Sequence, residues 1–386
     1  MKETSTIDTI VRCALTPLSW IYGGITMVRN KLFDLRVLKE KEYDVPVISI
    51  GNITVGGTGK TPHVEYLLSR LAMDYNIGVV SRGYRRKTRG FLLANGKSTP
   101  RSIGDEPYQI YQKFGHRVQV AVCEKRRTGI EKLLELHPEI NLIILDDAFQ
   151  HRYVKPRLSI LLVDYNRPTW KDNLLPLGRL REDRHSTDRA DMVIVTKCPD
   201  TMSPLDYRLV EKNLDLLAFQ KSYFSGLEYK GLRPVFPDDR PYSVSLHSLS
   251  KKDTVLLVTG IAHPRTFIRH FRKFPFKVKV NHFPDHHDFS RSDMQKILQK
   301  FDGMKGERKV IITTEKDAVR LVNNPYFPEE LKPLTYYIPI EVKMVEERGD
   351  SDIIADIRSA IGHYSTADAN DNVNDNDNDN DNDSQM

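Results

Sequence analysis

The sequence predicts an α/β fold on three observations. Short apolar runs alternate with stretches of helical periodicity along most of the 386 residues. The apolar runs are nearly continuous, as in parallel strands whose sheet is covered by helices on both faces. Between the runs, apolar residues recur on one helix face, as Val64, Leu67, Leu68 and Leu71 do. We therefore expect a main domain with a mostly parallel sheet, followed by a smaller C-terminal α/β domain.

The apolar runs define the expected strands. Their ranges are 46–50, 77–81, 118–122, 141–145, 158–163 and 192–196, followed by 254–259, 278–280 and 309–313. Helices are expected at 107–114, 264–274 and 293–301, and Ser290 with Asp293 gives the last one a capping-box start. The pair Asn95-Gly96 predicts a short β excursion.

Changes in composition divide the chain into five segments. Gly and Pro interrupt the pattern between Tyr223 and Tyr242, which we interpret as the join between two domains. Beyond residue 365, alternating Asn and Asp cannot form a core and predict disorder. The expected segments are a membrane-interfacial segment at 1–30, the main domain at 31–222, the smaller domain at 223–345, an extension at 346–364 and a disordered tail at 365–386.

The charge of the chain favours anionic ligands. The net charge is +6 although the C-terminal tail is rich in Asp, so the rest of the chain is more basic than this value suggests. A basic body attracts phosphates, acidic lipid or nucleic acid. The sequence has no zinc-finger or RNA-binding motif, so no nucleic-acid partner is expected. The three cysteines are far apart, lack metal-ligand spacing and cannot all pair, which indicates a reducing compartment. No export signal is recognised at the N-terminus.

A stretch without charged residues runs from Cys13 to Val28. It is shorter than a bilayer-crossing helix, which takes about 20 residues, and it contains Pro17. Arg12 precedes the stretch and Arg29 follows it. This pattern is typical of a segment that lies in the membrane interface with its cations at the headgroups. The alternative is a helix packed on the domain as part of its core.

A glycine-rich loop between the first strand and the following helix predicts a nucleotide site. Glycines let backbone N–H groups close around phosphate oxygens, and the helix N-terminus adds partial positive charge. In such a P-loop, Lys60 reaches the β- and γ-phosphates and Thr61 ligates Mg²⁺. The usual pattern has glycine at the position of Thr54. The expected nucleotide contacts are Thr54, Val55, Gly56, Gly57, Thr58, Gly59, Lys60 and Thr61.

The loop identifies the main domain as a P-loop NTPase domain with ATP and Mg²⁺ as ligands. A guanine-reading motif of the form Asn/Thr-Lys-x-Asp is not formed at 196–199, because Pro199 occupies the place of Asp. At 314–317 the required residues stand in the wrong order. Both observations favour ATP over GTP.

Two acids at the end of an apolar strand supply the second half of the site. Asp146 and Asp147 directly follow the run at 142–145. An acid in this place holds Mg²⁺ directly or through water. Neighbouring strand residues point to opposite sides, and the sequence leaves open which of the two faces the metal. The alternative is a pair of solvated acids at a strand end.

Several short motifs follow one another in order around this site. They are Gly51-Asn52, Gly56–Pro62, Ser81-Arg82-Gly83-Tyr84, Gly104-Asp105-Glu106-Pro107, Asp146–His151, Leu175–Glu182, Asp285-His286-His287 and Thr314–Ala318. This ordered set resembles the tetraacyldisaccharide 4'-kinase family of lipid A biosynthesis, over roughly residues 10–345. Ala148 stands where the family usually has Gly, and the Asn/Asp tail is not part of the family pattern.

The resemblance implies an enzyme that transfers the γ-phosphoryl group of ATP to the 4'-hydroxyl of a tetraacylated glucosamine disaccharide 1-phosphate. It implies that the enzyme acts on an amphiphilic glycolipid at the cytoplasmic face of the inner membrane. The N-terminal segment would contact the membrane surface, and no protein partner is required.

The resemblance also assigns roles to Asp105 and His286, and the needs of phosphoryl transfer suggest roles for other side chains. Asp105 would be the general base, although an Asp just before a helix is often its N-cap. His286 would pair with Asp105 across the domain cleft, whereas the alternatives are a metal ligand or a polar loop residue. Arg181 would grip phosphate or transition-state charge unless it is a solvated surface charge. Lys60 would neutralise phosphate charge, and Glu106 would assist at Mg²⁺ or position Asp105. The expected metal contacts are Thr61, Asp146, Asp147 and Glu106, and weaker candidates near the phosphates are Arg82 and His151.

A different function class is a P-loop switch or partition-type ATPase that acts through a protein partner. Such proteins often carry a Lys early in the loop, where this chain has Val55. A nucleotide-gated membrane scaffold is a third class. Asp105 and His286 discriminate between these classes, because a scaffold has no use for a general base.

Overall fold

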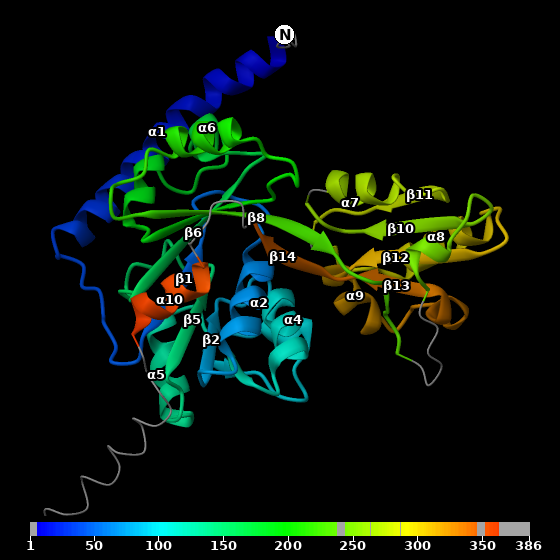
Figure 1. Cartoon of the computed structure of the whole chain (residues 1–386), viewed down its shortest axis with the longest axis horizontal. Coiled ribbons are helices and arrows are strands. Elements are labelled where there is room, and N and C mark those ends of the chain that lie inside the picture. The colour runs from blue at the N-terminus through cyan, green and yellow to red at the C-terminus, as the bar shows by residue number, and fades with distance from the viewer. Residues whose placement is uncertain (1–5, 238–243, 263, 286, 346–351, 363–386) are drawn as a thin grey trace, which may run out of the picture.

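The computed structural model describes residues 6–237, 244–262, 264–285, 287–345 and 352–362. Two sheets form its framework, and the α/β class is confirmed (Figure 1). The strands of the larger sheet are β1 (Val47–Gly51), β2 (Ile77–Ser81), β3 (Leu92–Leu93), β4 (Val118–Val122), β5 (Leu142–Asp146), β6 (Leu158–Asp164), β7 (Met192–Thr196), β8 (Lys221–Tyr229) and β14 (Ile340–Met344). Their order across the sheet is β14-β8-β7-β6-β1-β5-β2-β4-β3.

The larger sheet is parallel except at its two edges. β1 lies in the interior and pairs in parallel with β5 on one side and β6 on the other. β3 and β14 pair antiparallel with β4 and β8. The carboxyl ends of the parallel strands therefore meet at one edge, which is where open α/β sheets bind their ligands.

Helices cover both faces of the larger sheet. They are α2 (Lys60–Leu71), α3 (Pro100–Ile103), α4 (Asp105–Phe114), α5 (Arg126–Leu136) and α6 (Pro204–Leu214). As its periodicity predicted, α2 buries its apolar face against strand residues such as Ile48 and Ile144. Short 3-10 helices occur at Thr169–Lys171, Arg184–Arg189, Leu246–Ser248 and Glu329–Leu334.

The smaller sheet is likewise sandwiched between helices. Its strands are β9 (Arg233–Pro234), β10 (Thr254–Thr259), β11 (Lys277–His282), β12 (Lys309–Thr314) and β13 (Thr335–Ile338), in the order β11-β10-β12-β13-β9. Its helices are α7 (Pro264–Phe271), α8 (Arg291–Asp302) and α9 (Glu315–Val322). Phe267 and Phe271 pack on one face, and Met294 and Ile297 pack on the other. Ser290 caps α8 in the expected capping box.

The N-terminal helix α1 (Thr6–Asp34) lies along the outside of the larger unit (Figure 1). One side of α1 docks on the body. Ser19 Oγ donates to the Leu174 carbonyl oxygen at 2.9 Å, and Phe33 is buried. The other side carries large exposed apolar residues, namely Leu18, Trp20, Ile21, Ile25, Met27 and Val28. None of the described helices combines the length and apolar character needed to cross a membrane.

Several elements differ from the sequence predictions. β8 runs across residue 223, where we expected the join between domains, and its residue Tyr229 pairs with Ile340 of β14. Both strands thus belong to the larger sheet although they were expected in the smaller domain. Helix α10 (Ile353–Ile361) lies in the expected extension, yet its four isoleucines are part of the main core. The β excursion is reduced to the two residues of β3, and α7 ends at Phe271. The tail at 365–386 lies outside the described residues.

Candidate active site

The phosphate-binding loop joins β1 to α2 at the carboxyl edge of the larger sheet. Gly56 and Gly59 have φ values of 113° and 94°, which residues with side chains rarely adopt. Gly59 is the N-cap of α2, and Lys60 is the first residue of the helix. Gly51 has no room for a Cβ, because Phe149 Cβ lies 2.6 Å from that position. The loop and the helix N-terminus form an arrangement that binds phosphate.

Asn52 fixes the loop from inside. The buried Asn52 amide donates to Thr58 Oγ1 at 2.8 Å, and its carbonyl oxygen accepts from Lys60 Nζ at 3.3 Å. A second contact of Lys60 is Asp147 Oδ1 at 3.5 Å. The ammonium group is therefore held at the mouth of the loop, where the phosphates bind.

His63 ties the loop to a distant strand. Its Nδ1 lies 2.8 Å from the Gly59 carbonyl oxygen, and its Nε2 lies 2.9 Å from Ser225 Oγ in β8. Burial lowers the pKa of His63 to about 4, so the ring is neutral. Because a carbonyl oxygen can only accept, Nδ1 carries the proton and Nε2 accepts from the Ser225 hydroxyl.

The paired acids at the end of β5 lie in different environments. Asp147 has a φ of 49°, and Arg181 Nη1 lies 3.1 Å from its Oδ1. Burial opposes its ionisation, but Lys60 and Arg181 outweigh burial and lower the pKa of Asp147. Burial raises the pKa of Asp146 to about 6, and the nearby Asp147 charge adds to this effect.

Asp146 offers an oxygen ligand for a cation. Asp146 is 4% exposed, and its Oδ2 accepts from Ser81 Oγ at 3.3 Å. Its Oδ1 has no hydrogen-bond partner among the described residues. A buried carboxylate oxygen without a partner fits Mg²⁺, which usually binds one or two carboxylates together with phosphates and water. Thr61, in the first turn of α2, fits the same role through its hydroxyl.

The Glu106 charge acts on Asp146, but the described acids do not form a metal site by themselves. This charge contributes to the raised pKa of Asp146, while the Glu106 carboxylate pairs with Lys316 Nζ at 3.1 Å. In the described part of the chain, no three His, Cys, Asp or Glu side chains are grouped closely enough to hold a metal by themselves. The residues therefore fit a cation whose remaining ligands are phosphate oxygens of the nucleotide and water.

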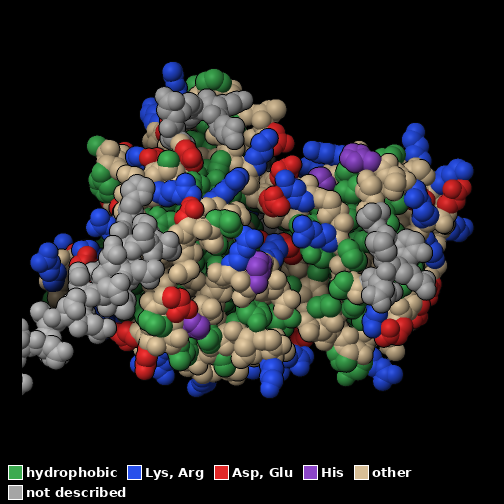
Figure 2. Space-filling view, turned by 60° about the horizontal axis from the view of Figure 1, so that its bottom comes forward, with side chains coloured by type: hydrophobic (Ala, Val, Ile, Leu, Met, Phe, Trp, Pro, Cys, Tyr) green, Lys and Arg blue, Asp and Glu red, His purple; other side chains and the backbone are tan. Residues whose placement is uncertain are grey.

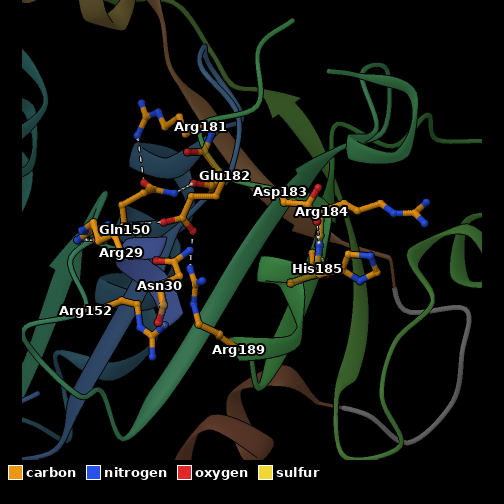
Figure 3. Close-up of polar contacts among 12 residues, drawn as sticks. Arg29, Asn30, Gln150, Arg152, Arg181, Glu182, Asp183, Arg184, His185 and Arg189 are labelled. Atoms are coloured by element: carbon orange, nitrogen blue, oxygen red, sulfur yellow. Dashed lines mark hydrogen bonds and ion pairs between the residues drawn. The ribbon is translucent and has the colours of Figure 1, made fainter. Parts of the chain in front are cut away.

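Arg181 lies in a cluster of charged side chains beside α1 (Figure 3). Besides Asp147, its guanidinium contacts Gln150 Oε1 at 3.4 Å. The next residue, Glu182, is buried between Arg189 and Arg29 of α1. Arg181 is therefore not a solvated surface charge. On the face shown in Figure 2, Lys, Arg and His side chains also gather near the middle.

Asp105 is the first residue of α4 and does not cap it. The N-cap is Gly104, whose φ is 95° and whose Cβ, if present, would lie 3.1 Å from the Tyr84 carbonyl oxygen. The buried Asp105 carboxylate accepts two hydrogen bonds from the Arg320 guanidinium of α9, one of them from Nε at 3.1 Å. The interpretation of Asp105 as a helix cap is therefore wrong.

His286 lies outside the described residues, so its pairing with the candidate base stays a prediction. The residues on either side of it contact the larger unit. Arg85 Nη1 lies 3.4 Å from the Asp285 carbonyl oxygen, and Arg101 Nη2 lies 3.2 Å from Asp288 Oδ2. This segment of the smaller domain therefore reaches the edge of the sheet where α4 begins.

Sequence reasoning missed Arg320 and its helix. Glu315 and Lys316 of α9 also contact α4, through Lys113 at 2.7 Å and Glu106 at 3.1 Å. The acidic start of α4 thus faces Lys316 and Arg320 of α9. The basic residue near the end of α4, Lys113, faces Glu315. This complementary charge pattern is the signal that could have indicated the contact.

His151 is a structural residue next to the site. Its Nε2 accepts a hydrogen bond from the Arg126 backbone N–H at 3.2 Å. Burial lowers the pKa of His151 to about 4, and nearby arginines add to this effect. Because the His151 ring is neutral, it offers no positive charge to a phosphate. Arg82, the other candidate named with it, is exposed.

We predict that acid destabilises the protein partly through His151. Its pKa is about 4 in the folded state and about 6.5 when unfolded. The unfolded state therefore binds more protons between these values, and the free energy of unfolding falls as the pH falls from 6.5 toward 4. Denaturant titrations should show that the free energy of unfolding falls less from pH 7 to pH 4.5 in His151→Gln than in wild type. Glutamine keeps a hydrogen-bond acceptor but does not titrate. The exposed His116→Gln is the control, and equal losses in wild type and His151→Gln would contradict the assignment.

The chain matches the protein family described as tetraacyldisaccharide-1-P 4'-kinase over residues 11–358. It is 50% identical over 343 residues to a tetraacyldisaccharide 4'-kinase of Bacteroides thetaiotaomicron, with 87% of this chain and 90% of that protein covered. It is 40% identical over 344 residues to the protein of the same name from Flavobacterium johnsoniae, with 89% and 96% covered.

A solved structure has the same fold. The crystal structure of the "apo" form of LpxK from Aquifex aeolicus in complex with ATP aligns with a TM-score of 0.68 at 30% identity, covering 91% of this chain and 100% of that chain. The resemblance inferred from the ordered motifs is confirmed, and so is the prediction of an ATP-dependent lipid A kinase. The chain belongs to the tetraacyldisaccharide-1-P 4'-kinase family.

Proposed function

We propose that this kinase phosphorylates the 4'-hydroxyl of tetraacyldisaccharide 1-phosphate with Asp105 as its general base. The observation that carries this role is the place of the Asp105 carboxylate. It is buried at the start of α4, next to Glu106, whose charge acts on Asp146 at the end of β5. A base in this place faces the same edge of the sheet as the phosphate-binding loop.

The reaction needs a proton acceptor and neutralisation of phosphate charge. As the 4'-oxygen bonds to the γ-phosphorus, its proton passes to the Asp105 carboxylate. The bond from the γ-phosphorus to the β–γ bridging oxygen breaks, and ADP leaves. Lys60 and Arg181, which meet at Asp147, stabilise the charge that develops on the transferred group. Asp146 and Thr61 would hold Mg²⁺, which neutralises the β- and γ-phosphates.

The smaller domain controls the base through α9. Arg320 holds Asp105 from that domain and also donates from Nη1 to the His287 carbonyl oxygen at 3.0 Å. A movement of α9 therefore changes the partners of Asp105. We infer that His286 becomes its partner when the domains close on both substrates, which also excludes water from ATP.

Replacing the base should separate chemistry from nucleotide binding. For Asp105→Asn we expect kcat to fall by about 10²–10⁴-fold, because the amide cannot accept the hydroxyl proton. The Kd of ATP, measured by titration calorimetry, should change little. Asp302→Asn, an exposed acid at the end of α8, is the matched control. Equal losses in kcat and ATP affinity would assign Asp105 a structural role instead.

We also propose that α1 contacts the lipid surface at the cytoplasmic face of the inner membrane. Its exposed side carries Trp20 and Ile25, which are 74% and 65% exposed. Lys31, in the last turn of the same helix, is exposed. Apolar residues with a neighbouring cation are the composition of an interfacial helix, which gives the enzyme access to an amphiphilic substrate.

Charge on the exposed side of α1 should release the protein from membranes. The double variant Trp20→Glu, Ile25→Glu should lose sedimentation with vesicles that contain anionic lipid, because buried apolar area is replaced by charge. Activity on detergent-dispersed substrate should remain. Met73→Glu, at a residue that is 74% exposed elsewhere on the body, is the control. Sedimentation of the double variant equal to wild type would overturn the assignment.

A further inference from the structure

A cavity of about 860 Å³ separates the larger unit from the smaller domain. Its walls come from α2 and α4, which stand on the side of the larger unit that faces the smaller domain (Figure 1), and from α9, β9 and β14. A tightly packed interface would leave no space of this size. Apolar packing therefore does not join α9 to α2 at this place, and a group of polar side chains on the wall of the cavity does.

Lys113 of α4 is the centre of this polar group. Its Nζ lies 2.7 Å from Glu65 Oε2 in α2 and 2.7 Å from Glu315 Oε1 in α9. Gln109, one turn earlier in α4, donates from Nε2 to Glu65 Oε1 at 2.7 Å and to Glu315 Oε2 at 3.4 Å. The two glutamate side chains are only 9% and 11% exposed. One ammonium group and one amide thus hold two buried acids, one from the larger unit and one from the smaller domain.

The two acids are not equivalent partners of Lys113. Burial raises the pKa of Glu65 to about 7, an effect that Lys113 opposes and Glu315 increases. Glu65 is therefore only partly ionised at neutral pH. Burial also disfavours the charge of Lys113, but the two acids outweigh burial and raise the pKa of Lys113. The buried ammonium group therefore depends on Glu315, the acid that the smaller domain contributes.

The contact at Lys113 is one of two that hold α9 against α4. Glu315 at the start of α9 meets Lys113 near the end of α4, whereas Arg320 farther along α9 meets Asp105 at the start of α4. The two helices therefore run in opposite directions and are held at both ends. Because a short helix moves as a rigid element, a displacement of α9 at Lys113 also displaces Arg320 from Asp105.

We propose that Lys113 is a positioning residue, which sets the place of the smaller domain relative to Asp105 through its ion pair with Glu315. This role rests on the proposed assignment of Asp105 as the general base. Removing one partner of a buried charge pair weakens the contact between the surfaces that it joins. Since a cavity adjoins this pair, packing does not compensate for the loss. The smaller domain then occupies more positions, and the reactive arrangement is populated less.

Two matched variants separate this role from packing of the polar group itself. Glu315→Gln removes the charge from the smaller domain, whereas Glu65→Gln resembles protonated Glu65 and leaves the pair of Lys113 with Glu315 intact. We expect kcat on the lipid acceptor to fall at least about tenfold in Glu315→Gln and to stay near the wild-type value in Glu65→Gln. The Kd of ATP without acceptor should change little in either variant. Glu131→Gln, whose carboxylate pairs with Lys41 at the surface at 2.7 Å, is the control.

The place of the smaller domain can also be measured without the reaction. Met73 and Asp302 are exposed residues of the larger unit and of the smaller domain. Spin labels on Met73→Cys and Asp302→Cys report the distance between the two by double electron–electron resonance. The exposed native cysteine is removed by Cys13→Ser, and the other two cysteines are buried. The distance distribution should broaden in Glu315→Gln and match that of wild type in Glu65→Gln.

Equal effects of the two glutamine variants, on kcat or on the distance distribution, would overturn the proposal. The two readouts also distinguish its failure from that of the proposed base. Full activity of Asp105→Asn would contradict the assignment of the base, whereas the distance distribution would still test the role of Lys113. An unchanged distribution in Glu315→Gln would contradict the role of Lys113 and leave the assignment of Asp105 as it stands.

Discussion

Side chains from outside the phosphate-binding loop hold three of its carbonyl groups, and the rest of the site depends on this constraint. Gly57, Thr58 and Gly59 each accept a hydrogen bond from a side chain of another element or of α2, namely Lys197, Thr196 and His63. With the carbonyl oxygens held, the N–H groups face the ligand without reorganisation. The electrostatics of the site therefore rest on residues that do not touch the transferred phosphoryl group.

The same contacts connect the loop to the rest of the molecule. His63 reaches Ser225 in β8, and β8 pairs with β14, the strand that leads back from the smaller domain (Figure 1). A second connection runs from α4 to α9, where Asp105 meets Arg320. The phosphate-binding loop and the start of α4 thus each have a link to the smaller domain. Under the proposed domain closure, a movement of that domain would act on the loop and on Asp105 together.

Local patterns in the sequence predicted the elements that hold the nucleotide. The strands around the loop, the buried face of α2 and the cap of α8 follow from periodicity and capping, which act over a few residues. β8 escaped prediction because Gly226 and polar residues interrupt its apolar pattern. The Asp105–Arg320 pair could not be predicted because 215 positions separate the partners, and only the tertiary fold joins them. The proposal that Asp146 serves the metal also required the structure, since Asp146 has an unpartnered buried oxygen whereas Asp147 pairs with Lys60 and Arg181.

The central claim is that one edge of the larger sheet binds the triphosphate and also activates a sugar hydroxyl. The most direct measurement is ³¹P nuclear magnetic resonance of a reaction that contains the protein, Mg²⁺-ATP and the tetraacylated disaccharide 1-phosphate. The account predicts a new phosphomonoester at the 4' position, formed in equal amount to ADP. Consumption of ATP that yields only inorganic phosphate would contradict it and would indicate a nucleotide switch instead.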